Sequence, residues 1–510
     1  MKLSELLKAV HIKAENEIRR TVDPEIVSMH YRADTVLPGG LFVAIPGLSA
    51  DGHDFIDQAM DRGACAVIVQ KAVRKEGIFI QVEDSRKALS ALAARFYSHP
   101  SDKMTMIGIT GTNGKTTTSY LIESMLNVSA VPCGVIGTIN YRYGDKSFDN
   151  PMTTPESMDL HRILSEMVDN GVSHVVMETS SHAIDLNRIS DIFFRVGIFT
   201  NLSQDHLDYH VDMDSYWACK KRFFTESLDT RQKIDPAIAV INCFHEKGEE
   251  LRSLLEAGKK RPRIITIGLT ENHDIQVEKS NITLSGITAS IKTPIGNMEF
   301  SSPLAGQFNL ENILCAIGSG CGLGLTISDM KKGIESFASV PGRLEPVINR
   351  SGRYVFVDYA HTPDALEKVL SALRSLTTGR LICIFGCGGD RDRSKRPIMG
   401  SIAGKLSDLC IITSDNPRTE DKMAIIQEIL EGIRPVKTQV KEDAAAPFEG
   451  YMIEPDRKSA IQKGIDASLP GDTILIAGKG HETYQIIGKE KTPFDDRIEA
   501  ENMLKGVEMR

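Results

Sequence analysis

The chain has 510 residues, of which 41% are hydrophobic and 25% charged, a composition that is ordinary for a globular protein and excludes a disordered or fibrous chain. At roughly 150 residues per domain, this length predicts three domains. The net charge of −8, from 60 Lys and Arg against 68 Asp and Glu, excludes a general nucleic-acid binder, which would need a basic surface, but not a nucleotide ligand.

The first hundred residues alternate short apolar runs with helical periodicity. Residues 41–45 and 64–69 are predicted to be buried strands, and residues 84–97 a helix. Turn signals at 38–40 and 46–47 separate these elements. The pattern predicts a small N-terminal α/β domain over residues 1–100.

A second α/β run begins at Met104, where a strand leads into a glycine-rich turn and a helix from Lys115 to about Val128. The other strands predicted in this run are 174–177, 195–200 and 237–241. Strands that alternate with helices predict a mostly parallel sheet of the P-loop type. Alternating apolar and polar positions over 264–303 predict appended antiparallel hairpins. Together these patterns predict a central domain over residues 101–338.

A third α/β run follows Pro341-Gly342. Its predicted strands, separated by amphipathic helices, are 354–357, 381–385, 408–413 and 473–477. This pattern predicts a C-terminal Rossmann-like α/β domain over residues 339–510.

The nine cysteines are an odd number and include no CxxC pair. Disulfide scaffolds and structural zinc sites are therefore poorly supported, and a reducing compartment fits best. Charged residues interrupt the first 20 positions, unlike in a signal peptide, and no apolar stretch reaches the roughly 18 residues of a membrane helix. We expect a cytoplasmic protein without a membrane span.

The strongest local motif is the glycine-rich run from Gly108 to Thr118, which lies between a predicted strand and a predicted helix. Backbone amides of such a loop bind phosphate oxygens, Lys115 would reach the β- and γ-phosphates, and the Thr116 hydroxyl would hold Mg²⁺. A standard P-loop has glycine where Ile109 stands, which suggests a different subclass of phosphate loop. The residues expected to bind nucleotide phosphates are Gly111, Thr112, Asn113, Gly114, Lys115, Thr116 and Thr117.

Polar residues also follow the next two strands. Glu178 is a candidate magnesium ligand at a strand end, or else a helix-capping or surface acid. His206 and His210 have the spacing of a zinc pair on a helix, but Leu207 stands where a zinc protease has glutamate, so zinc is not expected. The other polar residues in that stretch are Asn201, Asp205 and Asp208. By itself, Lys220 is typical of a solvated lysine.

In the third domain, four polar clusters end four predicted strands. They are 358–361, 386–393, 414–418 and 478–482. Because parallel strands bring their carboxyl ends to one edge of a sheet, these clusters predict a binding rim for a small, charged, polar molecule.

Several motifs together resemble the ATP-dependent Mur ligases of peptidoglycan synthesis. They are Gly-Thr-Asn-Gly-Lys-Thr-Thr at 111–117, the stretch 201–206, Gly306-Gln-Phe-Asn309, Pro341-Gly-Arg343 and Asp358-Tyr-Ala-His361. The resemblance spans residues 41–488 and is greatest to the members that add the third peptide residue.

The resemblance implies that ATP phosphorylates the D-Glu side-chain carboxylate of UDP-N-acetylmuramoyl-L-Ala-D-Glu, and that the amine of meso-diaminopimelate attacks the acyl phosphate. It implies one Mg²⁺ near Thr116 and Glu178, and a second held by His206 and a carbamylated Lys220. With Lys115, the residues Glu178, His206 and Lys220 would form the catalytic set. Further contacts with ATP are implied for Asn309, Arg343, Asp358 and His361.

Substrate contacts are also implied. Thr153, Thr154, Ser180 and Arg188 match positions that hold the UDP-muramoyl peptide. The run Asp415, Asn416, Pro417, Arg418 marks diaminopimelate members, where an arginine fork binds the distal carboxylate that lysine lacks. Arg391, Gly478 and Glu482 match the remaining diaminopimelate contacts. We expect a monomer that binds no nucleic acid.

Three alternatives remain open. The first is the same reaction with L-lysine or on an altered muramoyl precursor. The altered precursor is suggested by Arg32-Ala33-Asp34, which departs from the Asp-Ser-Arg usual near the uridine. A folylpolyglutamate-type ligase would share the phosphate loop but not the run 415–418 or the N-terminal domain. A nucleotide-binding scaffold without chemistry would have lost Lys115, Glu178, His206 or Lys220, and all four are present.

Overall fold

A computed structural model of the chain describes residues 1–15, 22–47, 50–205, 209–228, 236–259, 262–440 and 449–508. The chain divides into two units. Unit 1 holds Met1–Gln276, Lys292–Gly296 and Asn312–Gly333, and unit 2 holds Val277–Ile291, Asn297–Glu311 and Ile334–Arg510. None of the helices in the described part combines the length and the apolar character that crossing a membrane requires.

The N-terminal sheet of unit 1 has five strands in the order β1-β5-β4-β3-β2. Its strands are β1 (Ile12–Glu15), β2 (Ser28–His30), β3 (Gly40–Val43), β4 (Ala64–Val69) and β5 (Phe79–Val82), and its helices are α1 (Leu3–Leu6), α3 (Ile56–Asp61) and α4 (Ser85–Phe96). All neighbours are parallel except β1 and β5. Helix α4 begins where the Asp84 carboxylate accepts hydrogen bonds from two backbone amides, a typical N-cap. The predicted small α/β fold is confirmed.

The largest sheet has the order β16-β15-β14-β13-β12-β11-β6-β10-β7-β8-β9. Its strands are β6 (Thr105–Thr110), β7 (Cys133–Ile136), β8 (Asn140–Tyr143), β9 (Lys146–Asp149), β10 (His174–Glu178), β11 (Val196–Phe199), β12 (Ile238–Asn242), β13 (Arg263–Gly268), β14 (Ile275–Thr283), β15 (Gly286–Thr293) and β16 (Gly296–Ser302). The strands from β7 to β13 in this order are parallel, and β8 and β9 are antiparallel.

The hairpin prediction for 264–303 was wrong at its start. Strand β13 pairs in parallel with β12 and continues the parallel sheet. Its last four residues are buried, as in a strand covered on both faces, so a run of buried residues was mistaken for an alternating one. Only β14, β15 and β16 follow one another through two-residue turns.

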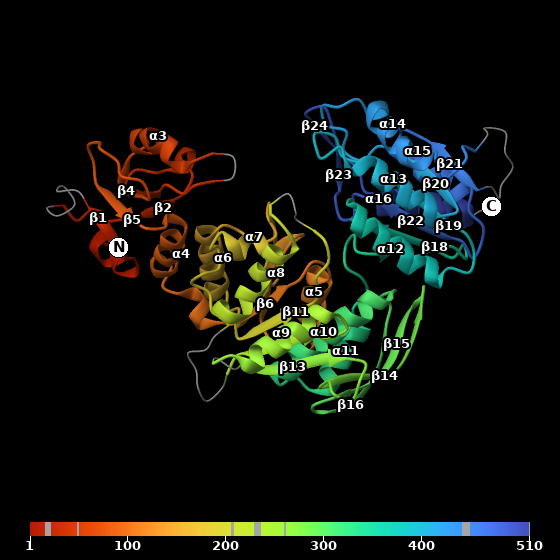
Figure 1. Cartoon of the computed structure of the whole chain (residues 1–510), viewed down its shortest axis with the longest axis horizontal. Helices are drawn as coiled ribbons and strands as arrows, with labels where there is room; N and C mark the ends of the chain where they lie inside the picture. Colours follow the sequence, from red (N-terminus) through yellow and green to blue (C-terminus); the bar gives the residue numbers. More distant parts are fainter. Residues whose placement is uncertain are drawn as a thin grey trace. The chain divides into compact units, whose positions relative to one another are not determined.

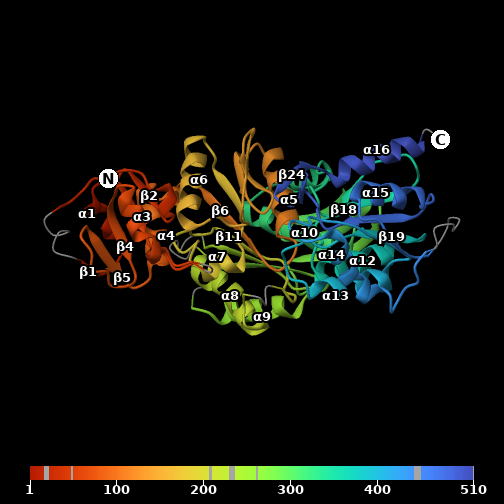
Figure 2. The same cartoon turned by 90° about the horizontal axis from the view of Figure 1, so that it is seen from above.

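Helices cover this sheet. They are α5 (Lys115–Val128), α6 (Ser157–Asp169), α7 (Ser181–Asp185), α8 (Met213–Arg222), α9 (Glu246–Ala257), α10 (Gln307–Leu323) and α11 (Ile327–Glu335). Side chains of α6, α8 and α9 share one hydrophobic core with β6, β10 and β11. Helix α4 of the N-terminal sheet lies beside α6 in both views (Figures 1 and 2). The N-terminal sheet and the larger sheet of unit 1 are thus connected through the contact of α4 with α6.

The C-terminal sheet of unit 2 has the order β17-β18-β22-β19-β20-β21. Its strands are β17 (Glu345–Pro346), β18 (Tyr354–Asp358), β19 (Leu381–Phe385), β20 (Leu409–Ile412), β21 (Gly450–Ile453) and β22 (Thr473–Ala477), followed by the hairpin β23 (Tyr484–Ile487) and β24 (Glu490–Pro493). Its helices are α12 (Pro363–Leu376), α13 (Lys395–Leu406), α14 (Lys422–Ile433), α15 (Arg457–Asp466) and α16 (Asp496–Glu508).

This sheet is doubly wound. Only β17 runs antiparallel, and α12, α13 and α14 pack on one face while α15 and α16 pack on the other (Figure 1). The carboxyl ends of β18, β22, β19 and β20 therefore lie next to one another, which brings the four predicted polar clusters to one edge. The Rossmann-like prediction is confirmed.

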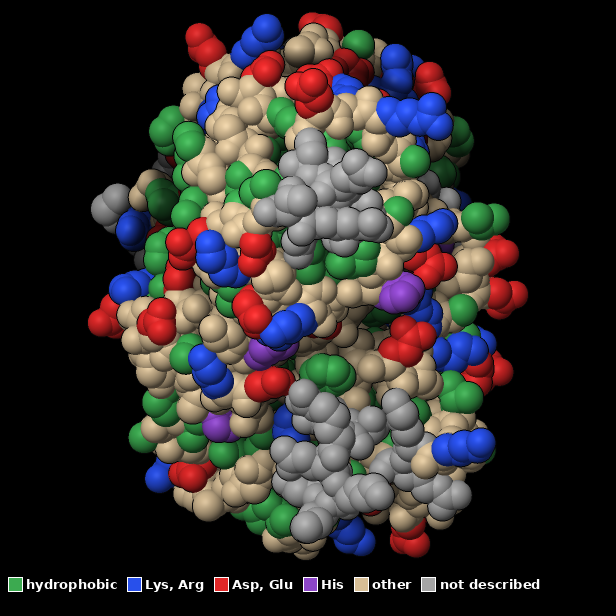
Figure 3. Space-filling model, turned by 90° about the vertical axis from the view of Figure 1, so that its left-hand side faces the viewer, with side chains coloured by type: hydrophobic (Ala, Val, Ile, Leu, Met, Phe, Trp, Pro, Cys, Tyr) green, Lys and Arg blue, Asp and Glu red, His purple; other side chains and the backbone are tan. Residues whose placement is uncertain are grey.

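The surface and the cysteines agree with the composition. On the face in Figure 3, basic and acidic side chains are interspersed among the described residues, without a patch of one sign. All nine cysteines are free in the structure. The mixed charge on this face offers no basic track of the kind that nucleic acids bind.

Candidate functional site

The glycine-rich loop joins β6 to α5 in unit 1. Thr112 and Asn113 donate backbone hydrogen bonds to the backbone oxygen and to Oδ1 of Asn201, at 2.9 and 3.0 Å. Lys115 Nζ turns back on the loop and donates to the carbonyl oxygens of Gly111 (2.9 Å) and Thr112 (2.8 Å). The loop is thus held by the segment that follows β11, with its cation at the start of α5.

Gly114 is the position where this loop requires glycine. Its φ is +86°, in the left-handed region, and it precedes the first residue of α5. A Cβ here would meet Oδ1 of Asn312, which is buried on α10. Both the backbone angle and the close approach therefore exclude larger residues without strain.

Glu178, at the end of β10, has a buried carboxylate. One oxygen accepts hydrogen bonds from Oγ1 of Thr116 (3.1 Å) and Oγ1 of Thr138 (2.9 Å), and the other accepts from the amide of Thr138 (2.9 Å). The predicted partners Thr116 and Glu178 therefore meet, although 62 residues separate them. The alternative of a surface acid is excluded because only 1% of Glu178 is exposed.

Lys220 is not the solvated lysine that its position alone would suggest. It lies on α8, is 1% exposed, and donates from Nζ to the carbonyl of Gly111 at 3.0 Å, the same oxygen that accepts from Lys115. Its ammonium lies 4.4 Å from the centre of the Tyr216 ring. Burial lowers the pKa of Lys220 well below its ordinary value, and the charge of Lys115 lowers this pKa further.

Thr154, Ser180 and Arg188 form a neighbouring polar group. Thr154 Oγ1 lies 3.3 Å from Ser180 Oγ and accepts from the Ser180 amide at 3.1 Å. Arg188 donates to the Thr154 carbonyl (3.1 Å), and its Nε lies 3.4 Å from Glu156. Thr153 lies instead beside Thr138, a hydrogen-bond partner of Glu178, with 3.1 Å between the two Oγ1 atoms.

Two predicted residues of this region, His206 and Asp208, lie outside the described residues. The nearby His210 is buried, with its ring 5.1 Å from that of Tyr216. At the N-terminal sheet, the unusual Arg32 and Asp34 form an exposed ion pair of 2.7 Å.

In unit 2, three predicted residues surround the end of β18. The Asp358 carboxylate accepts from the amides of Leu344 (2.6 Å) and Ala360 (2.8 Å), and burial raises its pKa. Arg343 lies 4.8 Å from the centre of the Tyr359 ring. The edge of the His361 ring packs on the same tyrosine at 4.5 Å, and burial lowers the pKa of this histidine.

The fourth residue of this set, Asn309, lies on α10 and is 2% exposed. It donates from Nδ2 to the Ala305 carbonyl at 2.8 Å, one turn earlier in the chain.

A second group, the rim cluster, consists of Asp415, Asn416, Arg418, Gly478, Lys479 and Glu482 at the ends of β20 and β22. Asn416 donates to Glu482 Oε2 at 2.8 Å, and the fully buried Lys479 donates to Asn416 Oδ1 (3.2 Å) and Glu482 Oε2 (3.0 Å). Asp415 Oδ2 is buried and has no hydrogen-bond partner within the described ranges. A Cβ on Gly478 would lie 2.5 Å from this oxygen.

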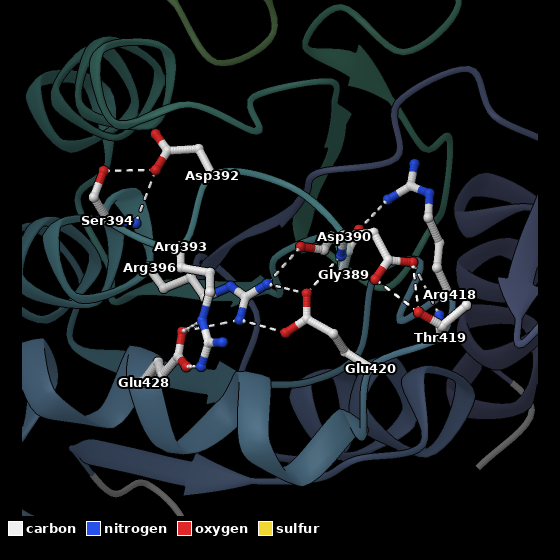
Figure 4. Close-up of polar contacts among 11 residues, drawn as sticks. Gly389, Asp390, Asp392, Arg393, Ser394, Arg396, Arg418, Thr419, Glu420 and Glu428 are labelled. Atoms are coloured by element: carbon white, nitrogen blue, oxygen red, sulfur yellow. Dashed lines mark hydrogen bonds and ion pairs between the residues drawn. The ribbon is translucent and has the colours of Figure 1, made fainter.

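Arg418 and Arg391 both lie beside Gly388. A Cβ at Gly388 would be 3.0 Å from Arg418 Nη1 and 3.7 Å from Arg391 Cγ. Arg418 has a φ of +51° and donates from Nη1 to the Gly389 carbonyl at 2.7 Å (Figure 4). A left-handed angle at a non-glycine residue costs about 1 kcal/mol or more and is common at functional sites.

Ion pairs hold the loop that carries Arg391. Arg396 is fully buried and lies between Glu420 and Glu428, at 2.9 Å from each (Figure 4). Arg393 also pairs with Glu428, and Thr419 donates to the Asp390 carboxylate at 2.8 Å. These bonds tie residues 389–396 to the segment that follows Arg418.

A buried ion pair is hydrogen-bonded to the backbone next to the rim cluster. Arg457 and Asp496 are both fully buried and are 2.7 Å apart. Arg457 also donates to the carbonyl oxygens of Ser414 (3.3 Å) and Ala477 (3.0 Å), which directly precede Asp415 and Gly478.

Three site residues were missed by the sequence interpretation. Thr138 follows the short apolar run of β7, which could have been identified as a strand. Lys479 lies inside the run 478–482 but was not singled out. Arg457 carries no local signal, because its partners are 20 to 43 residues away.

Comparisons with known proteins agree with this geometry. The profile for the Mur ligase family, catalytic domain, matches residues 25–97; that for the Mur ligase middle domain matches 109–320; and that for the Mur ligase, glutamate ligase domain, matches 342–480. A protein of Geobacter metallireducens, named UDP-N-acetylmuramoyl-L-alanyl-D-glutamate–2,6-diaminopimelate ligase, is 46% identical over 98% of this chain and 97% of its own.

Solved structures are also similar. One with the same ligase name has a TM-score of 0.70 and 28% identity, and the alignment covers 100% of both chains. A MurF ligase of Thermotoga maritima in complex with ADP shares the fold, with a TM-score of 0.59 and 19% identity over 94% of this chain and 98% of its own. The resemblance inferred from the motifs is confirmed: the chain belongs to the Mur ligase family.

Proposed function

We propose that the protein is an ATP-dependent ligase that joins meso-diaminopimelate to the D-Glu side-chain carboxylate of UDP-N-acetylmuramoyl-L-Ala-D-Glu in peptidoglycan synthesis. The observation that carries this proposal is the rim cluster, in which Asp415 has a buried oxygen without a hydrogen-bond partner among the described residues, together with Arg391, which lies beside Gly388 as Arg418 does. This pattern offers cations to a carboxylate and an anion to an ammonium, as an amino-acid site requires.

The amino acid would bind through both kinds of charge. Arg391 and Arg418 would hold the distal carboxylate, with Arg418 as the bidentate fork, while Asp415 and Glu482 would receive ammonium. A buried carboxylate oxygen without a partner costs free energy, which a bound ammonium would recover. Lysine has no distal carboxylate and would leave the arginines unpaired, which supports diaminopimelate over lysine.

ATP and Mg²⁺ fit the residues of unit 1. The loop amides and Lys115 suit phosphate oxygens, and the Thr116 hydroxyl and Glu178 carboxylate are the hard oxygen donors that Mg²⁺ prefers. Bound Mg²⁺ would offset the repulsion between a carboxylate and a triphosphate. Lys115 would leave the carbonyls of its own loop to contact the phosphates.

Lys220 would serve as a carbamate. Only a neutral amine attacks CO₂, and burial, together with the charge of Lys115, lowers the pKa of Lys220 toward the neutral form. The carbamate would supply anionic oxygens at a second Mg²⁺, with His206 as the other ligand. The ammonium groups of Lys115 and Lys220 both donate to the Gly111 carbonyl. With a carbamate on Lys220, these two neighbours would have opposite charges.

Thr153, Thr154, Ser180 and Arg188 would hold the UDP-muramoyl peptide, and Asn309, Arg343, Asp358 and His361 would contact ATP. Transfer of the γ-phosphoryl group to the D-Glu carboxylate releases ADP. The amine then attacks the acyl carbon, loses a proton, and displaces phosphate from the tetrahedral intermediate. The reaction thus forms one amide bond for each ATP cleaved to ADP and phosphate.

The proposal assigns three domains, over residues 1–100, 101–338 and 339–510, to the nucleotide sugar, to ATP and to the amino acid. The three profile matches fall within these limits, which supports them. We also infer a cytoplasmic location, because nine free cysteines are typical of a reducing compartment. The monomeric state stays a prediction.

The decisive experiment measures phosphate release with ATP, Mg²⁺ and UDP-N-acetylmuramoyl-L-Ala-D-Glu, supplying diaminopimelate, lysine or ornithine separately. We expect release with diaminopimelate at least about 10²-fold faster than with lysine. Equal rates of phosphate release with diaminopimelate and lysine would favour the alternative in which lysine is a substrate. Release only with an altered muramoyl peptide would favour a divergent paralogue. No release with any acceptor would overturn the ligase assignment.

Carbamylation has its own test. The purified protein is supplied with ¹³C-bicarbonate, and a carbamate carbon signal is sought by NMR in the wild type and in Lys220→Arg. A signal in the wild type alone is expected. The absence of a signal in both proteins would contradict the carbamate.

A further inference from the structure

A cysteine, a glutamate and a histidine that have no role in the sites described above meet in unit 1. Cys243 directly follows β12, Glu249 lies in the first turn of α9, and His273 lies between β13 and β14. One potential ligand atom from each lies within 4.8 Å of the other two. Among the described residues, this is the only trio of His, Cys, Asp and Glu with that separation.

Both nitrogens of the His273 ring have polar neighbours. Its Nδ1 is 2.9 Å from Thr270 Oγ1 and 3.3 Å from the Thr270 carbonyl, while Nε2 faces Glu249 Oε1 at 3.0 Å. A carboxylate only accepts, so the neutral ring donates from Nε2 to Glu249, and Nδ1 accepts from the Thr270 amide at 3.4 Å. Ligation through Nε2 would therefore require the ring proton to move to Nδ1, where the Thr270 carbonyl can accept it and fix the tautomer, as in metal-binding histidines.

The fold makes room for this ring and holds the cysteine opposite it. A Cβ on Gly268, the last residue of β13, would overlap the His273 imidazole, so the ring lies flat against the strand only because position 268 is glycine. The Cys243 amide donates to the Ile267 carbonyl at 2.9 Å, which fixes the cysteine backbone beside the end of β13. Three separate elements thus converge on one point.

We propose that Cys243, Glu249 and His273 bind a borderline-soft divalent cation, with Zn²⁺ as the best fit. Thiolate, imidazole and carboxylate are the three ligand types of tetrahedral zinc. With Zn–N of about 2.0 Å and Zn–S of about 2.3 Å, tetrahedral ligands lie roughly 3.3–3.8 Å apart. The His273 Nε2–Glu249 Oε1 separation of 3.0 Å is already near this range, and the separations from the cysteine, which are within 4.8 Å, would close by at most about 1 Å. The Glu249 side chain is 46% exposed, which leaves a fourth position to water.

Binding exchanges one proton for the cation, because the Cys243 thiol must ionise to ligate. The bound ion would connect the turn after β12 and the start of α9 to the loop after β13. The sequence offered no sign of this site, since it contains no CxxC pair and His273 is 30 residues from Cys243. None of the three residues has a role in the ligase reaction proposed above.

The test uses the full-length protein, stripped with a chelator and kept in excess Mg²⁺ so that oxygen-rich sites are filled. Titration with Co²⁺ should give one bound ion per chain and the absorption of a cobalt–thiolate bond. Cys243→Ser should abolish this absorption, whereas Cys65→Ser, which changes the other half-buried cysteine, should keep it. No thiolate absorption in the wild type, or an unchanged one in Cys243→Ser, would overturn the proposal.

Glu249 has a matched control on its own helix. Glu249→Gln should weaken Co²⁺ binding more than about 10-fold, because losing a ligand costs at least as much as losing a partner that orients one. Glu246→Gln, at an exposed position in the same first turn, should leave binding unchanged. Equal affinities of the two variants would remove Glu249 from the site and overturn the three-ligand proposal.

A final measurement needs no variant, so a folding defect cannot obscure it. Alkylation of the wild-type protein is followed at each cysteine by mass spectrometry, with and without one equivalent of Zn²⁺. Zn²⁺ should slow the labelling of Cys243 more than about 10-fold, as a ligated thiolate is not free to react, and should leave Cys65 unaffected. Equal rates at Cys243 would show a hydrogen-bonded His–Glu pair beside a free thiol and would overturn the site.

Discussion

The glycine-rich loop of unit 1 and the rim cluster of unit 2 both lie at the carboxyl ends of parallel strands, but they are held in different ways. The loop is one continuous segment between β6 and α5, and neutral hydrogen bonds to Asn201, in the segment after β11, hold it. The rim cluster combines the segments after β20 and β22, tied by the buried Arg457 and by Lys479. The groups proposed to bind phosphate thus come from one stretch of chain, whereas those proposed to select the amino acid come from two stretches that buried charges connect.

The largest effect should come from the cation of the loop. Lys115→Ala should lower kcat at least about 10³-fold, because a cation that stabilises a transferring phosphoryl group acts mainly in the transition state. The control Lys103→Ala, at an exposed position before β6, should retain full activity. Steady-state phosphate release measures both, and a loss below about 10-fold in Lys115→Ala would contradict the assigned role.

The buried ion pair between Arg457 and Asp496, which supports the rim cluster, can be removed by mutation. Arg457→Ala should destabilise unit 2 by about 3–5 kcal/mol, because it leaves the buried Asp496 carboxylate without a partner. The neighbouring Lys458→Ala removes an exposed ion pair with Glu499 and should cost less than about 1 kcal/mol. Hydrogen exchange of the β20 and β22 amides measures both, and similar protection in the two variants would refute the contrast.

Selectivity should separate the rim cluster from the loop. Arg418→Ala should lower kcat/KM for diaminopimelate about 10²-fold while the KM for ATP stays unchanged, because the guanidinium would contact only the amino acid. Arg434→Ala, an exposed arginine after α14, serves as the control. A parallel rise in the KM for ATP would indicate that Arg418 supports the whole unit instead.

The smallest effect is expected at Gly114, the residue that precedes α5 in the glycine-rich loop. Gly114→Ala should weaken ATP binding about 10-fold, from about 1–2 kcal/mol of left-handed strain together with the approach to Asn312. Gly171→Ala has a similar φ of +77° but open space around it, so it carries the backbone strain alone and should leave ATP affinity unchanged. Equal ATP affinities in the two variants would show that neither the strain at Gly114 nor its approach to Asn312 affects ATP binding.

Much of the fold was predictable because its signals are local. The bounds 64–69, 115–128, 381–385 and 473–477 agree with β4, α5, β19 and β22 residue for residue. The start of the hairpin region was wrong, because the buried run of β13 was mistaken for an alternating pattern. The strand β7 was missed because its apolar run is only four residues long, and Thr138 was missed with it.

The sequence by itself determined the three α/β runs, the glycine-rich loop and the family, because strand, loop and helix are neighbours in the chain and their periodicity is read directly. Only the tertiary structure decided which distant side chains meet. Lys220 shares the Gly111 carbonyl with Lys115, Gly478 makes room for Asp415, and Cys243 faces His273. The physical reason is that periodicity marks a residue as buried, whereas strand order and register choose the partner it is buried against.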